Sequence, residues 1–256
     1  MPPLQRTTKF HQSLSWWVLG LLPLSGIAYL RVIASQSWQL KAYIFHELSI
    51  LFAVGLAALF MTIAYRNFKK TEDTYYQSVI LGLLSFIIVF LPHGLLTNFS
   101  DQNQILFLAF GPLSRAIVSI YLFFGLLQQP HAKRRNKAQK RSIQWTHHLV
   151  FFVICDVLLF ISAGFLNWLT VTHLRIFEAI ALSFFGMSLL VLLRKSHRPF
   201  SQHLKLMFFL FIQVSIAFLL AYPWNYLWWF AHGISLAGFL ILGYTTILYS
   251  KDIQTV

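Results

Sequence analysis

Residues 76–96 (YQSVILGLLSFIIVFLPHGLL) and 105–127 (ILFLAFGPLSRAIVSIYLFFGLL) are two apolar runs separated by a short polar segment. Each run matches the length of about 20 residues that a helix needs to cross the hydrocarbon core of a bilayer. The two runs contain one arginine, Arg115, and one histidine, His93. A helix on the surface of a soluble protein would carry a broad polar face. The stretch therefore predicts two membrane-spanning helices joined by a short loop.

The same character extends over the whole chain. Of its 256 residues 57% are hydrophobic and 11% are charged, and the mean hydropathy is +0.65. A soluble domain would need far more charge on its surface. We therefore expect an all-α, polytopic membrane helix bundle of about eight transmembrane helices, forming a single domain over residues 1–256 without a soluble domain. The predicted spans are Leu14–Leu30, Ala42–Tyr65, Tyr76–Leu96, Ile105–Leu127, His148–Leu169, Leu174–Leu193, Leu206–Tyr222 and Tyr226–Tyr249.

Basic residues predict the orientation of these spans. The formal net charge is +13, which in a soluble protein would suggest a nucleic-acid partner. Here the Lys and Arg residues gather in alternate segments, as the positive-inside rule requires of cytoplasmic loops. With both termini cytoplasmic, the only exceptions are Arg31, Lys41, Arg115 and Arg175. We therefore expect the lipid bilayer, and not nucleic acid, to be the main partner.

Ionisable side chains inside the spans are the candidates for function. On insertion scales such a group costs about 2.5–3.5 kcal/mol, so it usually faces the bundle interior and has a role. Arg115 and Asp156 lie near mid-membrane, and we expect them to form a structural ion pair. At a rise of 1.5 Å per residue, the others lie one to two turns below the predicted outer surface, on four different spans. These others are His46, Glu47, His93, Glu178 and His232.

This common depth predicts a ligand pocket near the extracytoplasmic side. Imidazole and carboxylate are common ligands of zinc, copper and iron, so His46, His93 and His232 are candidate metal ligands. Glu47 or Glu178 would then be a fourth ligand, an orienting group or a general base. The sequence contains neither HExxH nor CxxC. Three interpretations stay open: a centre for a transition metal (zinc, copper) or haem, a metal-free polar pocket, and a structural hydrogen-bond network.

Four segments resemble MASE-type domains, the membrane-associated sensor modules of bacterial signalling proteins. They are FHELSILFAVGLAALF, LGLLSFIIVFLPHGLL, LSRAIVSIYLFFGLL and LWWFAHGISLAGFLILGY. The resemblance implies a multi-pass protein of the bacterial cytoplasmic (inner) membrane. It also implies that His46 with Glu47, His93, Arg115 and His232 are positions of interest. Such modules usually lead into a cytoplasmic output domain, whereas this chain stops at Val256, soon after its last span.

The favoured hypothesis is a sensory module. A ligand would bind the predicted pocket, formed by His46, Glu47, His93, Arg115, Glu178 and His232, and signal to a cytoplasmic partner. It assigns no catalytic residue and favours a protein that is not an enzyme. The alternatives are an intramembrane zinc hydrolase acting on lipid and a haem or copper protein that transfers electrons. A homo-oligomer is compatible with each hypothesis.

Overall fold

The protein is described here from a computed structural model. It covers residues 18, 20–33, 38–128, 145–165, 168–194 and 201–254. Within these ranges every regular element is a helix, and seven helices are long and apolar enough to cross a membrane. This confirms the predicted all-α class. The helices are α2 (Tyr43–Thr71), α3 (Thr74–Leu95), α4 (Gln104–Leu127), α5 (Trp145–Gly164), α6 (Val171–Arg194), α7 (Ser201–Leu220) and α8 (Tyr226–Gln254), with a 3-10 turn η1 (Thr97–Phe99) before α4.

The segment predicted as the first span is a shorter apolar helix in the described residues, Gly20–Val32. Several other boundaries move outward from the prediction, although α5 ends at Gly164 and α7 at Leu220, before the predicted ends. α2 continues to Thr71 and α8 to Gln254, so much of the polar sequence expected in loops is helical. Helix ends commonly contain Lys and Arg, which interact favourably with the last carbonyls, and Lys69 and Lys70 occupy the last turn of α2.

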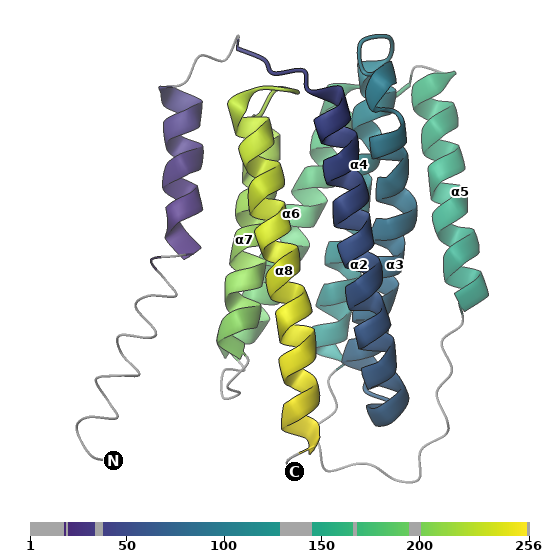
Figure 1. Cartoon of the computed structure of the whole chain (residues 1–256), viewed down its shortest axis with the longest axis vertical. Helices are drawn as coiled ribbons and strands as arrows, with labels where there is room; N and C mark the ends of the chain where they lie inside the picture. Colours follow the sequence, from purple (N-terminus) through teal and green to yellow (C-terminus); the bar gives the residue numbers. More distant parts are fainter. Residues whose placement is uncertain are drawn as a thin grey trace.

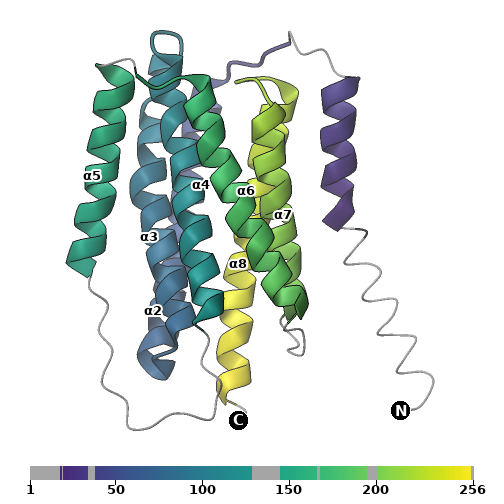
Figure 2. The same ribbon diagram turned by 180° about the vertical axis from the view of Figure 1, so that it is seen from behind.

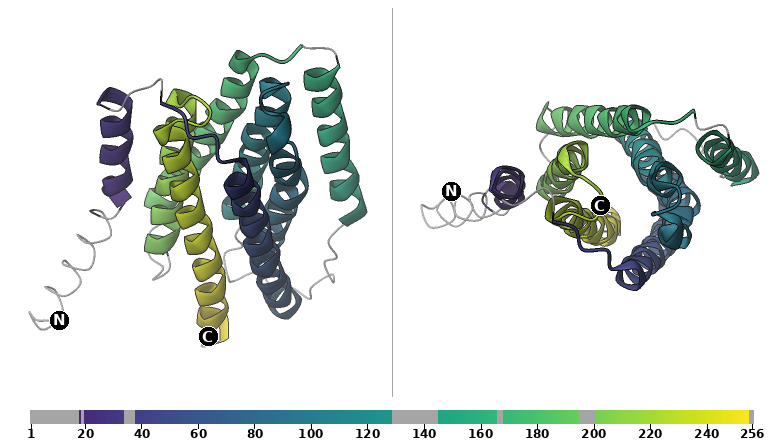
Figure 3. Two further views of the ribbon diagram at one scale, coloured as in Figure 1. Left: turned by 45° about the horizontal axis from the view of Figure 1, so that its top comes forward. Right: turned by 90° about the horizontal axis from the view of Figure 1, so that it is seen from above.

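Six of the helices form a closed ring. Each contacts the next in the order α2, α3, α4, α6, α7 and α8, and α8 returns to α2. Figures 1 and 2 show these helices running side by side along the long axis of the molecule. α5 lies outside the ring against α3 and α4, and Gly20–Val32 lies outside it on the other side, as the view from above shows (Figure 3). The contact between α2 and α8 is the sparsest of the ring, so it is the seam at which the ring closes.

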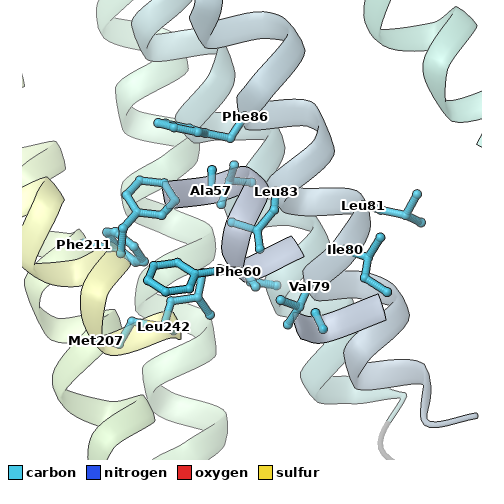
Figure 4. Close-up of a cluster of buried hydrophobic side chains, with 14 of the residues drawn as sticks. Ala57, Phe60, Val79, Ile80, Leu81, Leu83, Phe86, Met207, Phe211 and Leu242 are labelled. Atoms are coloured by element: carbon cyan, nitrogen blue, oxygen red, sulfur yellow. The ribbon is translucent and has the colours of Figure 1, made fainter. Parts of the chain in front are cut away.

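A large apolar core fills the half of the ring nearer the C-terminal end of α8. Side chains from several ring helices interlock there, among them Phe60 of α2, Phe86 of α3, Phe211 of α7 and Leu242 of α8 (Figure 4). Phe60 lies directly over Gly243, where a Cβ atom would overlap the phenyl ring. Glycine at this position therefore allows α2 and α8 to approach closely along the seam.

Two short connections place the site. Asp73 caps α3 by accepting a hydrogen bond from the Tyr75 backbone N–H at 2.9 Å, and Asn103 caps α4 through Leu106 N–H at 2.9 Å. Such caps satisfy amide groups that a helix start leaves free. Tight turns of this kind make α2, α3 and α4 antiparallel neighbours. The start of α2, the end of α3 and the start of α8 consequently lie at the same end of the bundle (Figure 1).

Candidate metal centre

Three histidines predicted as metal ligands meet at this end of the bundle. His46 lies in the first turn of α2, His93 in the last turn of α3 and His232 in the second turn of α8. One ring nitrogen of each lies within 4.8 Å of a ring nitrogen of both others. The ring centroids of His46 are 5.0 Å from His93 and 5.4 Å from His232. We call these three residues the His triad.

Hydrogen bonds to Nδ1 determine which ring nitrogen is free. His93 Nδ1 donates to the Phe107 carbonyl at 2.7 Å, and His232 Nδ1 donates to the Trp228 carbonyl at 2.9 Å. A carbonyl only accepts, so in the neutral imidazole the proton sits on Nδ1 and the Nε2 lone pair is available. Both rings therefore have the tautomer that a metal ligand needs.

Thr97 gives His46 the same tautomer. Its hydroxyl donates to the His93 carbonyl at 3.4 Å, from which we infer that its oxygen accepts from His46 Nδ1, 2.8 Å away. The Nε2 atoms of His46 and His232 are buried and have no hydrogen-bond partner among the described residues. A buried polar atom without a partner is rare in a native protein and calls for an explanation. A ligand bound by Nε2 would be one.

Aromatic rings enclose the triad. The His46 ring lies 5.0 Å from Trp228 and 5.4 Å from Trp224, and the His93 ring stacks on Phe107 at 4.7 Å. Trp224 and Trp228 are only 2% and 3% exposed. Tryptophans near the ends of membrane spans commonly lie at the membrane–water interface. These two instead pack inside the protein, where they keep water away from the imidazoles.

The triad fits a transition-metal ion in both donor type and spacing. Imidazole nitrogen suits Zn, Cu, Fe and Ni. Tetrahedral coordination at about 2.0–2.1 Å from the metal places ligand nitrogens roughly 3.4 Å apart. Nitrogens that already lie within 4.8 Å of one another would each move inward by less than about 1 Å. Side-chain rotations of roughly 10–15° can supply this movement and stay within one rotamer well.

Arg115 forms a buried ion pair with Glu178, which corrects the predicted pair of Arg115 with Asp156. Nε of Arg115 donates to both carboxylate oxygens of Glu178, at 2.9 and 3.2 Å, and Nη2 donates to Oε1. Asp156 lies on α5, outside the ring, and its Oδ1 has no partner among the described residues. α6, rather than α5, packs in the ring beside α4, so Glu178 is the acid that reaches the guanidinium.

Arg115 also connects this ion pair to the triad through one ring. Its guanidinium carbon lies 4.0 Å from the centroid of Phe218, whose ring is 5.1 Å from that of His232. A cation over an aromatic face is attracted by the ring quadrupole. The predicted site residues Arg115 and Glu178 are therefore neighbours of the triad, although their charges are taken up by each other.

Glu47, predicted as a metal ligand or general base, has a hydrogen-bond partner outside the triad. Its carboxylate accepts a hydrogen bond from Asn98 Nδ2 at 2.6 Å, at the exposed end of the bundle. Next to it, Asp101 accepts from Lys41 at 2.6 Å and from Tyr43 at 2.5 Å. These contacts hold the start of α2 against the connection between α3 and α4. They stabilise the rim of the site rather than add to its ligands.

Sequence reasoning missed Thr97 and Phe107. Thr97 lies in the connection after the third predicted span, and Phe107 contributes a backbone carbonyl that no sequence pattern identifies. Thr97 follows His93 by four residues, which is one helical turn. A hydroxyl at that spacing from a buried histidine was the available signal.

Comparison of the chain with protein-family models, with curated proteins and with solved structures finds no significant match.

Proposed function

We propose that this chain is a membrane sensor module that binds a transition-metal ion at the His triad and transmits binding along its helices to a cytoplasmic partner. The positive-inside pattern predicts that the triad end faces outward. The resemblance to MASE-type sensor domains, an expectation from sequence, agrees with this proposal. A zinc hydrolase would need a free carboxylate beside the metal, and Glu47 and Glu178 are both engaged elsewhere.

The observation that carries the proposal is that the three triad helices meet again at their other ends. Asn67 of α2 donates to the Thr246 carbonyl of α8 at 3.1 Å, and Tyr76 of α3 donates to the same carbonyl at 3.5 Å. All three residues are buried. His232 and Thr246 are 14 residues apart on α8, or about 21 Å along the helix axis.

This arrangement gives binding a mechanical route. A ligand shifts a conformational equilibrium only if it binds the two states with different affinity. The triad bridges the α2–α8 seam, so drawing its nitrogens together favours a closed seam at that end. Because α8 is one continuous helix, its movement changes the contact at Thr246. The inner ends of α2 and α8 would then present a different surface to a partner.

Distance measurements between spin labels test this proposal. Labels at Lys70→Cys and Ile247→Cys, in a Cys155→Ala background, report on the inner ends of α2 and α8. We expect a shifted distance distribution when a diamagnetic ion, Zn(II) or Cu(I), is added to protein in nanodiscs. The matched variant Asn67→Leu, which removes the contact to Thr246, should bind metal normally but show a smaller shift.

Two results would count against the proposal in different ways. An unchanged distribution with stoichiometrically bound metal would refute transmission and leave a metal-binding protein. Failure to bind either ion would refute the metal centre itself.

A further inference from the structure

The charge around the triad distinguishes between metal ions. The three imidazoles would bind a metal as neutral ligands, each with its Nδ1 hydrogen-bonded to a carbonyl or hydroxyl group. The Glu178 carboxylate is paired with Arg115, and the Glu47 carboxylate is bonded to Asn98 at the exposed rim. In the part of the chain that the structure describes, no carboxylate therefore remains to neutralise a cation in the triad.

A bound ion would accordingly keep its full charge in a low-dielectric site. The free energy needed to remove an ion from water rises with the square of its charge. The desolvation free energy of a divalent ion is therefore about four times that of a monovalent ion of the same size. Arg115, one phenyl ring away from His232, is paired with Glu178, so this neutral pair does not offset the charge of the ion. The desolvation cost therefore favours a monovalent metal.

Coordination number acts in the same direction. Zn(II) bound by three histidines completes a tetrahedron with water or another ligand. Here the imidazoles are enclosed by rings: Trp228 lies 4.2 Å from His232 between centroids, Phe218 5.1 Å from His232, and Phe90 5.3 Å from His93. Among the described residues, these rings offer a fourth ligand few polar groups, the indole N–H of Trp228 being one. Cu(I), a closed-shell monovalent ion, is satisfied by three nitrogen donors in a plane.

We infer that the triad binds Cu(I), coordinated by Nε2 of His46, His93 and His232. This inference rests on the metal centre of the proposed function and specifies its ligand. Cu(I) generally prefers sulfur donors. Cys155, the chain's single cysteine, lies on α5 outside the ring. Selection would therefore come from charge and coordination number, while the stacked rings exclude water and other ligands.

Anaerobic competition titrations test the inference. Full-length protein in detergent is titrated with Cu(I) against a chromophoric Cu(I) chelator, and separately with Zn(II) against a zinc indicator. We expect one Cu(I) to bind per chain. The affinity for Zn(II) should be at least about 100-fold weaker than the affinity for Cu(I). X-ray absorption of the Cu(I) form should show three nitrogen neighbours and no fourth ligand.

Two variants locate the site without relying on a ligand deletion alone. His93→Ala, which leaves two imidazoles, should weaken Cu(I) binding more than Thr97→Val, which keeps all three imidazoles and should weaken it about 10- to 100-fold. His173→Ala is the matched control, because His173 is an exposed histidine at the start of α6, and it should bind as the wild type does.

The outcomes separate the two levels of the proposal. Zn(II) binding as tight as Cu(I), or a fourth ligand on copper, would overturn the Cu(I) assignment and leave the metal-binding sensor intact. Binding of neither ion would overturn the metal centre as well. Cu(I) binding that keeps the wild-type affinity in His93→Ala with a native fold, checked by circular dichroism, would place the ion elsewhere and refute the triad.

Discussion

Removing a single hydroxyl group, in Thr97→Val, tests the chain of hydrogen bonds that prepares the triad. Thr97 is fully buried, and valine has nearly the same shape, so packing should be retained. The variant leaves the Nδ1–H of His46 without its acceptor at 2.8 Å. An unsatisfied buried donor costs about 1–3 kcal/mol. His46 can reduce this cost by moving its proton to Nε2, the atom that should bind the metal.

Metal binding must then reverse that proton shift. Loss of a group that orients a metal-bound histidine typically weakens metal affinity 10- to 100-fold, which is about 1.4–2.7 kcal/mol. The loss of stability should therefore be larger in the metal-loaded protein than in the metal-free protein. Chelator competition gives the affinity, and thermal unfolding with and without metal gives the difference in stability.

The control for this experiment is Ser85→Ala. Ser85 is also a buried hydroxyl of the α3 region, but its Oγ donates to the Gly82 carbonyl of its own helix. We expect no change in metal affinity. If Thr97→Val binds metal within about twofold of the wild type, while remaining folded, His46 does not depend on Thr97 and the tautomer argument is wrong.

Three further perturbations probe the fold around the site. Glu178→Ala leaves the Arg115 guanidinium buried without its partner and should lower the free energy of unfolding by about 3–5 kcal/mol, measured by denaturation in mixed micelles. Gly243→Leu places a side chain into the close α2–α8 contact, and we expect loss of stability of about 1–3 kcal/mol and faster proteolysis at the inner ends. The hydrogen bond between Lys41 and Asp101 lowers the pKa of Asp101, and the same hydrogen bond raises the pKa of Lys41. The stabilisation from this exposed pair is therefore present above the ordinary pKa of Asp101 and is lost as pH falls through the lowered pKa. Lys41→Met should accordingly lower the melting temperature slightly at pH 7 and have no effect once Asp101 is protonated. An equal change in melting temperature at both pH values would contradict this.

Depth in the membrane could be predicted from sequence, whereas rotation about each helix axis could not. Counting residues from the span ends placed His46, His93 and His232 in one layer, because the helical rise is constant. Whether they face one another depends on how the helices pack. Spans that are apolar on all sides have no clear hydrophobic periodicity that would show which face of each helix points inward. The tautomers of the three rings depend on carbonyls of other helices, and so were also beyond a sequence pattern.

The order of the helices in space could not be predicted from the sequence either, as the partner of Arg115 shows. Arg115 and Asp156 share a predicted depth near mid-membrane, which led us to expect that they pair, and consecutive elements are usually neighbours in space. The chain instead places α5 on the outside and inserts α6 beside α4. The acid on α6, Glu178, lay at a predicted depth nearer the outer surface. A long side chain such as arginine can reach across that difference by extending along the helix.

The position of the triad on the seam leads to a final prediction. His46 and His93 belong to α2 and α3, which pack so closely that a Cβ atom on Gly94 would lie 2.7 Å from Ile50. These two histidines should stay together whether the seam is open or closed, and only His232 should join or leave. His232→Ala should therefore still bind metal weakly through two imidazoles, yet bound metal should no longer change the distance between Lys70→Cys and Ile247→Cys. His46→Ala, which retains one ligand on each side of the seam, should keep part of that response. Equal loss of the response in both variants, at metal concentrations that saturate each, would show that the seam is not the element that metal binding moves.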